Sequence, residues 1–288
     1  MQILTPAQGE DFWRDGYLVT AGAVTAPHLG RLRDQLQGWI DESRGRSGNW
    51  GETYDKLPRF DLEDGHAADS PRLRRVNNPV EVSDVFFEAT FESPMRDMVA
   101  DLIGPNVKFH HSKINIKLPH TESRVGLHQD FSYTPHTNND IVTALLLLDD
   151  MTDDNGPLMA VPGSHREGQK SLWQDGAFTG RIAAEEGREL QDRLVPITGK
   201  AGGVCLMHTS LVHGSEPNRS DARRTLYISV YTAADAFPLH RSPLPNKYEG
   251  RIVAGQETRV ARLSAGAVEL PADFRQASFF HLSGQGTN

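Results

Sequence analysis

Cysteine is almost absent from this sequence, and long apolar runs are missing as well. The single cysteine in 288 residues, Cys205, excludes an intrachain disulfide; it lies in the apolar stretch 202–207, where a small core side chain is expected rather than a reactive thiol. The longest apolar run, residues 144–148, is much too short to span a bilayer. The N-terminus has no basic segment followed by an apolar core, so no signal peptide is predicted. We therefore expect a cytoplasmic protein with a reduced thiol.

An excess of positive charge is also lacking. Lys and Arg number 30 against 38 Asp and Glu, and the formal net charge is −8. This balance argues against a nucleic-acid or anionic-membrane partner. We expect the partner to be a small-molecule substrate. We expect the protein to be a monomer or a homodimer. Hydrophobic residues make up 38% of the chain, which is enough for a substantial core. The length suits a single domain, residues 1–288.

Helix signals dominate the first third of the chain. Thr5 is followed by a proline and, at the third helical position, by Gln8, which is typical of a capping box. Thr25 opens a second helix with apolar residues at helical spacing, and Ser93 opens a third. The polar segment between the last two, residues 44–78, is interpreted as a long loop that borders the mouth of an active site.

Strand signals separated by turn residues begin at residue 107. The expected strands are residues 107–118, 126–131, 141–149, 158–161, 194–197, 203–209 and 225–232, with a short helix at 183–192. Helices first and strands later argue against a parallel βαβ sheet. The pattern predicts a mainly β fold with flanking helices: a double-stranded β-helix, or cupin-like jelly-roll barrel. We expect residues 1–106 to form a mostly helical support and loop, 107–240 the barrel core and 241–288 a C-terminal extension.

A His-x-Asp pair, His128 and Asp130, is the strongest chemical signal. In an extended strand, residues at i and i+2 point to the same face, so both side chains are placed to bind one metal ion. One more imidazole completes a two-His, one-carboxylate set around Fe(II), which leaves the opposite face free for a cosubstrate and O2. Both His208 and His213 follow an apolar strand and are candidates for this third position. The alternative is a strand-end pair that forms only a hydrogen bond.

Two adjacent arginines, Arg223 and Arg224, precede the last expected strand. Their side chains must face opposite sides of that strand. Arg224 shares its side with an apolar set that faces the barrel interior: Leu226, Ile228 and Val230. Arg223 is then a solvated surface charge. The guanidinium of Arg224 is suited to a forked contact with the far carboxylate of a dicarboxylic 2-oxo acid.

The motif order resembles that of a known family. The relevant segments are His128-Gln129-Asp130, Asn155-Gly156-Pro157-Leu158, Val161-Pro162-Gly163-Ser164-His165, His213-Gly214-Ser215 with Asn218, and Arg223-Arg224. This order is similar to that of the phytanoyl-CoA dioxygenase family of Fe(II)/2-oxoglutarate oxygenases. Residues 110–117 are most similar to its ectoine hydroxylase branch. The resemblance is good over residues 109–231, looser before them, and fades after 240.

The resemblance implies the roles of the site residues. His128, Asp130 and His213 are the expected catalytic Fe(II) ligands, since His213 has the family context and lies 11 positions (224 − 213) before Arg224. Arg224, Asn115 and Ser215 are the expected contacts of 2-oxoglutarate. The alternatives are that Asn115 caps a turn and that Ser215 bonds local backbone. O2 and 2-oxoglutarate are the implied cosubstrates, succinate and CO2 the products, and an unactivated C–H bond the point of attack. Halogenating relatives lack the carboxylate ligand, so Asp130 favours hydroxylation or another oxidation such as desaturation.

The substrate is less well defined. The candidate pocket residues surround the metal pair in sequence: His111, Lys113, Gln129, Phe131, Ser132, Tyr133 and Thr134. The ectoine branch has glutamine where this chain has His111 and arginine where it has Lys113, so a substrate other than ectoine is expected. The polar set predicts a small polar or anionic metabolite, such as an amino acid derivative or a natural-product intermediate, rather than a lipid or a CoA thioester. Lys117 is expected on the barrel surface.

A second class of function uses the same ligands. A non-catalytic cupin-like binding protein, or a Zn-dependent enzyme, would also employ His128, Asp130 and His213. Arg224 disfavours both, because neither needs a clamp for a carboxylate.

Overall fold

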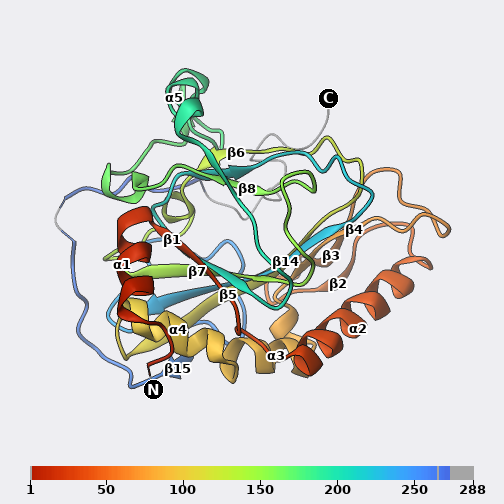
Figure 1. The fold of residues 1–288 in the computed structure, drawn as a ribbon, viewed down its shortest axis with the longest axis horizontal. Helices are drawn as coiled ribbons and strands as arrows, with labels where there is room; N and C mark the ends of the chain where they lie inside the picture. The colour runs from red at the N-terminus through yellow and green to blue at the C-terminus, as the bar shows by residue number, and fades with distance from the viewer. Residues whose placement is uncertain (1, 265, 273–288) are drawn as a thin grey trace.

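Two antiparallel sheets face each other across the molecule, and helices cover the outer side of the larger one (Figure 1). The computed structural model describes residues 2–264 and 266–272. Within them, the larger sheet has nine strands, in the order β1 (Tyr17–Thr20), β12 (Val204–His208), β7 (Ile141–Leu147), β14 (Arg224–Ala233), β5 (Val107–Lys117), β4 (Leu73–Asn77), β3 (Pro58–Leu62) and β2 (Trp50–Glu52), with β15 (Ile252–Ala254) beside β5. The smaller sheet has four, in the order β11 (Val195–Ile197), β8 (Leu158–Ala160), β13 (His213–Ser215) and β6 (Val125–His128). A hairpin of β9 (Trp173–Gln174) and β10 (Ala177–Phe178) lies outside both.

Strand β14 illustrates how side-chain alternation builds the layers. Leu226 and Ile228 point between the two sheets and pack in a core with residues of β8 and β11. Tyr227 and Tyr231 point the other way, toward the helices, where the Tyr231 hydroxyl donates to the carbonyl of Thr90 at 2.9 Å. Both faces of this strand are buried. Side chains on its inward face therefore lie in the space between the two sheets, where they can line a site.

The helices form the expected support. They are α1 (Pro6–Asp15), α2 (Ala26–Ser43), α3 (Asp84–Phe91), α4 (Pro94–Ile103) and α5 (Ala184–Glu189), with single 3₁₀ turns at Pro79–Glu81, Asp130–Ser132, Ser164–Arg166 and Gln191–Arg193. The starts predicted at Thr5, Thr25 and Ser93 are confirmed, since each of these side chains accepts a backbone N–H of the first turn. Helix α3 was not predicted; none of its first-turn N–H groups is capped by the side chain of Ser83.

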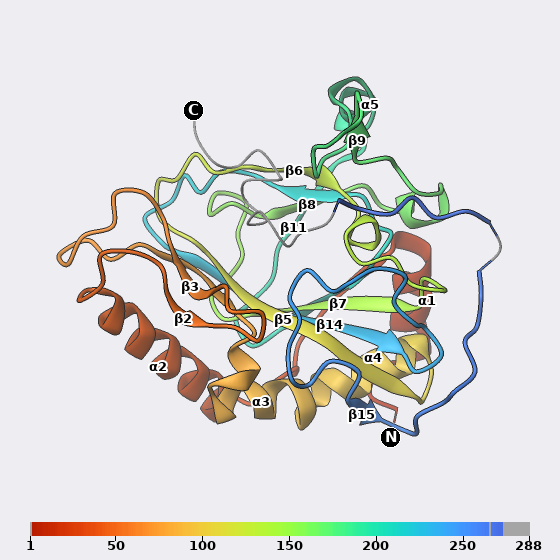
Figure 2. The ribbon, with the colours of Figure 1, turned by 180° about the vertical axis from the view of Figure 1, so that it is seen from behind.

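The prediction of a long loop at residues 44–78 is wrong, because the segment contains the strands β2, β3 and β4. These strands extend the larger sheet, and Figure 2 places β2 and β3 beside α2 at one end of it. Their inward residues are polar and nonetheless buried, as for Asp61 and Arg75. In β3 apolar and polar residues still alternate, but the polar side chains of Arg59 and Asp61 are buried as well as Phe60, so polarity does not mark the exposed face of this strand. Asp61 and Arg75 of this segment line a cavity described below, and its contact with an active-site mouth stays a prediction.

Two details of the predicted barrel also change. The strand expected at 126–131 ends at His128, and the chain then turns into the 3₁₀ turn that begins at Asp130. His213 does not end the apolar strand before it but begins a separate strand, β13, in the smaller sheet. The other expected strands lie where they were predicted. The domain division remains a prediction, and residues 273–288 of the C-terminal extension lie outside the described residues.

Candidate metal centre and adjoining cavities

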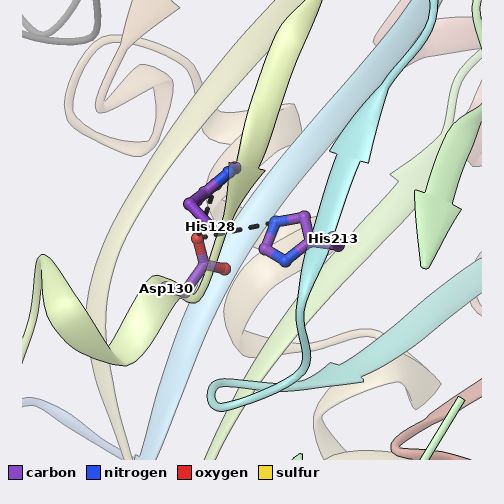
Figure 3. A group of neighbouring side chains, drawn as sticks. All are labelled: His128, Asp130 and His213. Atoms are coloured by element: carbon purple, nitrogen blue, oxygen red, sulfur yellow. Dashed lines mark ion pairs between the residues drawn. The ribbon is translucent and has the colours of Figure 1, made fainter. Parts of the chain in front are cut away.

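Two histidines and a carboxylate lie close together beside strands β6 and β13 of the smaller sheet. His128 ends β6 and His213 begins β13, and the two are cross-strand partners in an antiparallel ladder. Asp130 lies two residues beyond His128, where the turn directs its carboxylate back toward both rings (Figure 3). Its Oδ1 is 3.6 Å from Nε2 of His128 and 3.8 Å from Nε2 of His213. One atom from each residue lies within 4.8 Å of the others, a spacing suited to one metal ion.

Neighbouring groups hold each of these side chains in a metal-binding form. The Nδ1 of His128 lies 2.9 Å from the carbonyl of Gly126, and that of His213 lies 3.0 Å from the carbonyl of Leu211. A carbonyl only accepts, so each Nδ1 carries the proton and each Nε2 keeps its lone pair for a metal. Thr143 donates to Oδ2 of Asp130 at 2.8 Å, which leaves Oδ1 directed at the histidines. The donor set therefore fits a divalent transition metal such as iron.

The charge state of the group agrees with this arrangement. Burial lowers the pKa of His213 to about 4, so its imidazole is neutral at physiological pH. Burial opposes ionisation of Asp130, but His213 and His128 outweigh it and keep the pKa of that carboxyl well below its ordinary value. Neutral imidazoles and an ionised carboxylate are the protonation states in which these residues bind metals.

His208, the competing candidate, lies elsewhere. Its ring packs against Trp13 and His165, at centroid distances of 5.8 and 5.0 Å, on the side of the sheet that α1 covers. Its Nδ1 accepts the backbone N–H of Ser210 at 3.0 Å, and burial lowers its pKa to about 3. It is a packed, hydrogen-bonded histidine outside the metal group.

A cavity of about 160 Å³ adjoins the three residues. The residues that were expected to contact 2-oxoglutarate lie in its wall. Arg224, Ser215 and Asn115 all line it. The guanidinium of Arg224 is fully buried and donates to the carbonyl of Gly156 at 2.7 Å. Gly156 adopts a φ of +79°, and a Cβ there would lie 2.4 Å from the side chain of Lys117, so this turn requires glycine.

The two arginines separate as predicted. Arg224 enters the cavity, while Arg223 lies on the opposite face, partly exposed and 3.7 Å from Asp149. The structural alternative for Asn115 does not hold. Asn115 is in the middle of β5 and accepts a hydrogen bond from Nε of Arg75 at 3.1 Å, so it caps no turn.

Lys117 is a functional candidate that the sequence analysis placed wrongly on the surface. It is buried in this first cavity, where its Nζ donates to Oγ of Ser215 at 2.8 Å and to the carbonyl of Glu216. Burial, together with the nearby positive charge of Arg224, lowers its pKa to about 7. Its position two residues after Asn115 on the same strand was the available signal, because i and i+2 share a face.

A second cavity, of about 150 Å³, also adjoins the metal group, at His128 and Asp130. Four predicted substrate residues line it: His111, Lys113, Tyr133 and Thr134. Residues from the unpredicted strands β3 and β4 complete its wall, namely Asp61, Arg75 and Asn77. Lys113 and Arg75 line both cavities and therefore stand at their junction.

Three predicted substrate residues point away from both cavities. Gln129 is fully buried and binds only backbone: its amide donates to the carbonyl of Ser210 at 2.6 Å, and its oxygen accepts the N–H of Lys170 at 2.7 Å. Phe131 packs in a small apolar cluster with Ile141 and Val230. Ser132, in the same turn, lines neither cavity. The turn that begins at Asp130 rotates these side chains out of strand alternation, which the expected strand did not foresee.

Comparison with known proteins agrees with the geometry. The family model for phytanoyl-CoA dioxygenase (PhyH) matches residues 12–226. A probable alpha-ketoglutarate-dependent hypophosphite dioxygenase of Stutzerimonas stutzeri is 34% identical over 226 residues, 76% of this chain and 74% of the relative. An L-proline trans-4-hydroxylase of Streptomyces griseoviridis is 27% identical, over 80% of this chain and 87% of its own.

Solved structures share the fold. The crystal structure of EctD from S. alaskensis with bound Fe superposes with a TM-score of 0.68 at 23% identity, covering 91% of this chain and 88% of its own. The carbocyclase SnoK from nogalamycin biosynthesis gives a TM-score of 0.62 at 22% identity, covering 81% and 85%. The predicted double-stranded β-helix is thereby confirmed. No helix in the described part of the chain has the length and apolar character needed to cross a membrane. This chain belongs to the phytanoyl-CoA dioxygenase family.

Proposed function

We propose that the protein is an Fe(II)- and 2-oxoglutarate-dependent dioxygenase that hydroxylates a C–H bond of a small polar metabolite, an amino acid derivative or a natural-product intermediate. One observation carries the proposal: the group formed by His128, Asp130 and His213 adjoins a cavity that ends in buried cations. When bound, the iron with 2-oxoglutarate and O2 supplies the oxidising chemistry, with succinate and CO2 as products.

The residues of the chain have distinct tasks in this scheme. His128, Asp130 and His213 hold the metal and leave its other face toward the cavities. Arg224 holds the far carboxylate of 2-oxoglutarate, as a forked, charge-assisted donor at the closed end of the first cavity. Leu226 and other apolar side chains in the cavity wall exclude water from the site.

The names of the relatives support a small substrate. Two of these relatives are named for hypophosphite and L-proline. An ectoine dioxygenase of Halomonas elongata is 28% identical over 81% of this chain. The second cavity is of matching size, since an apolar cavity of about 150 Å³ admits a molecule as large as benzene.

The test is an anaerobic titration followed by turnover. Adding 2-oxoglutarate to the Fe(II)-loaded protein without O2 is expected to produce a visible charge-transfer band, and admitting air is expected to yield succinate. The Zn(II)-loaded protein serves as the control and should give neither. A non-catalytic binding protein, or a Zn-dependent enzyme, would produce no band with iron and no succinate, and this result would overturn the proposal.

We further expect Lys117 to make 2-oxoglutarate use depend on pH. Its pKa of about 7 means that the amine is protonated below that pH and neutral above it. Because only the protonated amine attracts a carboxylate, the KM for 2-oxoglutarate should rise above pH 7, by up to about tenfold per pH unit. Succinate formation at pH 6 to 9 measures this. Lys117→Met should have a raised KM at low pH and lose the pH dependence; a flat wild-type profile would contradict the role.

A further inference from the structure

Two neighbouring histidines on β5 lie side by side because the strand bulges there. In the register of β5 with β14, His111 pairs with Val230. The next pair is Phe109 with Tyr231, so His110 is an extra residue of β5 at this point. A bulge of this kind breaks the alternation of side chains and allows both rings to lie on one side of the strand. Their Nδ1 atoms are 2.6 Å apart, which is the distance of a hydrogen bond between the two imidazoles.

This pair of histidines connects the second cavity with an acid near the surface. His111 lines the cavity. On the other side of the pair, Nε2 of His110 lies 3.9 Å from Oε1 of Glu249, whose side chain is 30% exposed. Nδ2 of Asn246 donates to the carbonyl of His110 at 2.9 Å and so holds the segment that carries Glu249 against the bulge. The order from the surface to the cavity is therefore Glu249, His110 and His111.

We propose that Glu249 and His110 are positioning residues that set which ring nitrogen of His111 carries its proton, and hence whether the cavity offers the substrate a hydrogen-bond acceptor or a donor at that point. This role rests on the proposed function, because it takes the second cavity to be the place where the substrate binds. It makes recognition of the substrate depend on pH: the wall presents a lone pair when Glu249 is ionised and an N–H when it is protonated.

Only one proton can lie between the two rings. Burial lowers the pKa of His111 to about 3 and holds that of His110 well below its ordinary value, so both imidazoles are neutral at physiological pH. A neutral imidazole has one N–H and one lone pair. If Nδ1 of one ring donates, Nδ1 of the other must accept, so the two rings are opposite tautomers. Reversing this hydrogen bond therefore also exchanges the lone pair and the N–H at Nε2 of each ring.

The charge of Glu249 selects one of these two arrangements. An ionised carboxylate attracts an N–H, so it favours the proton on Nε2 of His110. Nδ1 of His110 then accepts from Nδ1 of His111, and Nε2 of His111 is left with a lone pair for the cavity. A protonated Glu249 favours the lone pair on Nε2 of His110 instead. The hydrogen bond between the rings is then reversed, and His111 presents Nε2–H.

A third histidine, His136, keeps the pair in place without exchanging protons with it. Its ring contacts that of His110, with the ring centroids 5.1 Å apart. Its Nδ1 lies 2.8 Å from the carbonyl of Thr134, and because a carbonyl only accepts, this nitrogen carries the proton. Burial lowers the pKa of His136 to about 4, so the ring stays neutral near pH 7. Its contribution is packing, and it adds no charge beside the pair.

Glu249 changes its charge near neutral pH. Burial raises the pKa of Glu249 to about 7, although the positive charge of Arg241 opposes this rise. Burial also lowers the pKa values of two lysines near the histidines, that of Lys113 to about 8, so variants must separate Glu249 from them. The titratable and charged groups that face the histidine pair are His136, Lys108, Lys113, Arg75 and Asp130.

Histidine ¹⁵N NMR of the Zn(II)-loaded protein tests the proposal. Zn(II) replaces Fe(II) because it is diamagnetic, and the spectra of His110→Phe and His111→Phe assign the two rings. The nitrogen shifts distinguish an N–H from a lone pair. At about pH 8.5 we expect His111 to carry its proton on Nδ1, and at about pH 5.5 on Nε2, with the change centred near pH 7. A single tautomer of His111 at both pH values overturns the proposal.

Variants identify the origin of the change. Glu249→Gln is uncharged at every pH and should leave His111 in one tautomer throughout. His110→Phe removes the bridge between the acid and His111 and should have the same effect. Glu257→Gln is the matched control, since Glu257 is an exposed acid eight positions (257 − 249) along the chain, and it should keep the change.

The outcomes of these variants are decisive. A change that survives in Glu249→Gln or in His110→Phe overturns the proposal, because another group, such as Lys113, then causes it. Loss of the change in Glu257→Gln overturns it as well, since the effect would not be specific to Glu249. The anaerobic charge-transfer band and succinate formation report on the proposed function separately, because the NMR samples contain no iron.

Discussion

Replacing Asp130 with alanine is expected to reduce 2-oxoglutarate turnover by more than about 100-fold, because loss of even an outer-shell partner of a metal ligand costs about 10–100-fold in affinity or activity. The carboxylate is the only anionic donor of the group, and its Oδ1 lies between the two imidazoles. Removing it leaves two neutral ligands, which bind Fe(II) weakly. Succinate formation and the iron content after anaerobic loading measure the two consequences together.

A milder variant serves as the matched comparison. Thr143→Val removes the hydrogen bond to Oδ2 of Asp130 and leaves the ligand in place. We expect a loss of about 10–100-fold in iron affinity, smaller than that of Asp130→Ala. Thermal unfolding of both variants checks that the fold persists. An Asp130→Ala enzyme with wild-type turnover would show that this carboxylate is not a ligand.

Arg224→Ala is expected to raise the KM for 2-oxoglutarate by about tenfold to a hundredfold. This range corresponds to the loss of a hydrogen bond to a charged group, worth about 1.5–3 kcal/mol. The guanidinium is buried at the end of the first cavity, where water cannot replace it. Initial rates of succinate formation at varied 2-oxoglutarate concentrations measure the change.

The neighbouring arginine provides the control. Arg223→Ala removes the same charge from the adjacent position, but its side chain lies outside the cavity and is partly exposed. The KM for 2-oxoglutarate of this variant should stay within about twofold of the wild-type value, because Arg223 does not line the cavity and its partly exposed ion pair with Asp149 is worth at most about 1 kcal/mol. Equal effects of the two substitutions would mean that Arg224 acts through the net charge of the region and not through contact with the cosubstrate.

Local patterns in the sequence were sufficient for much of the fold and for the metal group. Caps at Thr5, Thr25 and Ser93 predicted three helices because capping depends on residues two or three positions apart. The His-x-Asp pair was visible as a short motif, although a turn and not strand alternation directs Asp130. The inward direction of Arg224 was visible because alternation along a strand places side chains by short-range geometry. The resemblance, rather than the residues alone, selected His213 over His208.

Other features depend on partners far away in the chain. Strands β3 and β4 were interpreted as part of a loop. Their inward residues include Asp61 and Arg75, and these polar side chains are buried only because β3 pairs with β4 and β4 pairs with β5. Lys117 was predicted to lie on the surface, because no residue near it in the sequence indicates that its amine contacts Ser215 and the carbonyl of Glu216. Gln129 looked like a pocket residue, yet it binds the backbone around residues 168 and 210.

The sequence by itself was sufficient to recognise the family motifs, to predict a barrel and to identify Arg224 as the arginine that points inward. These follow from side chains a few positions apart, whose directions are set by backbone geometry. Only the tertiary structure decided that Lys117 enters the first cavity and that strands β3 and β4 form part of the wall of the second. Such contacts join segments that are distant in the chain, so the packing of the two sheets, and not any local preference, places them.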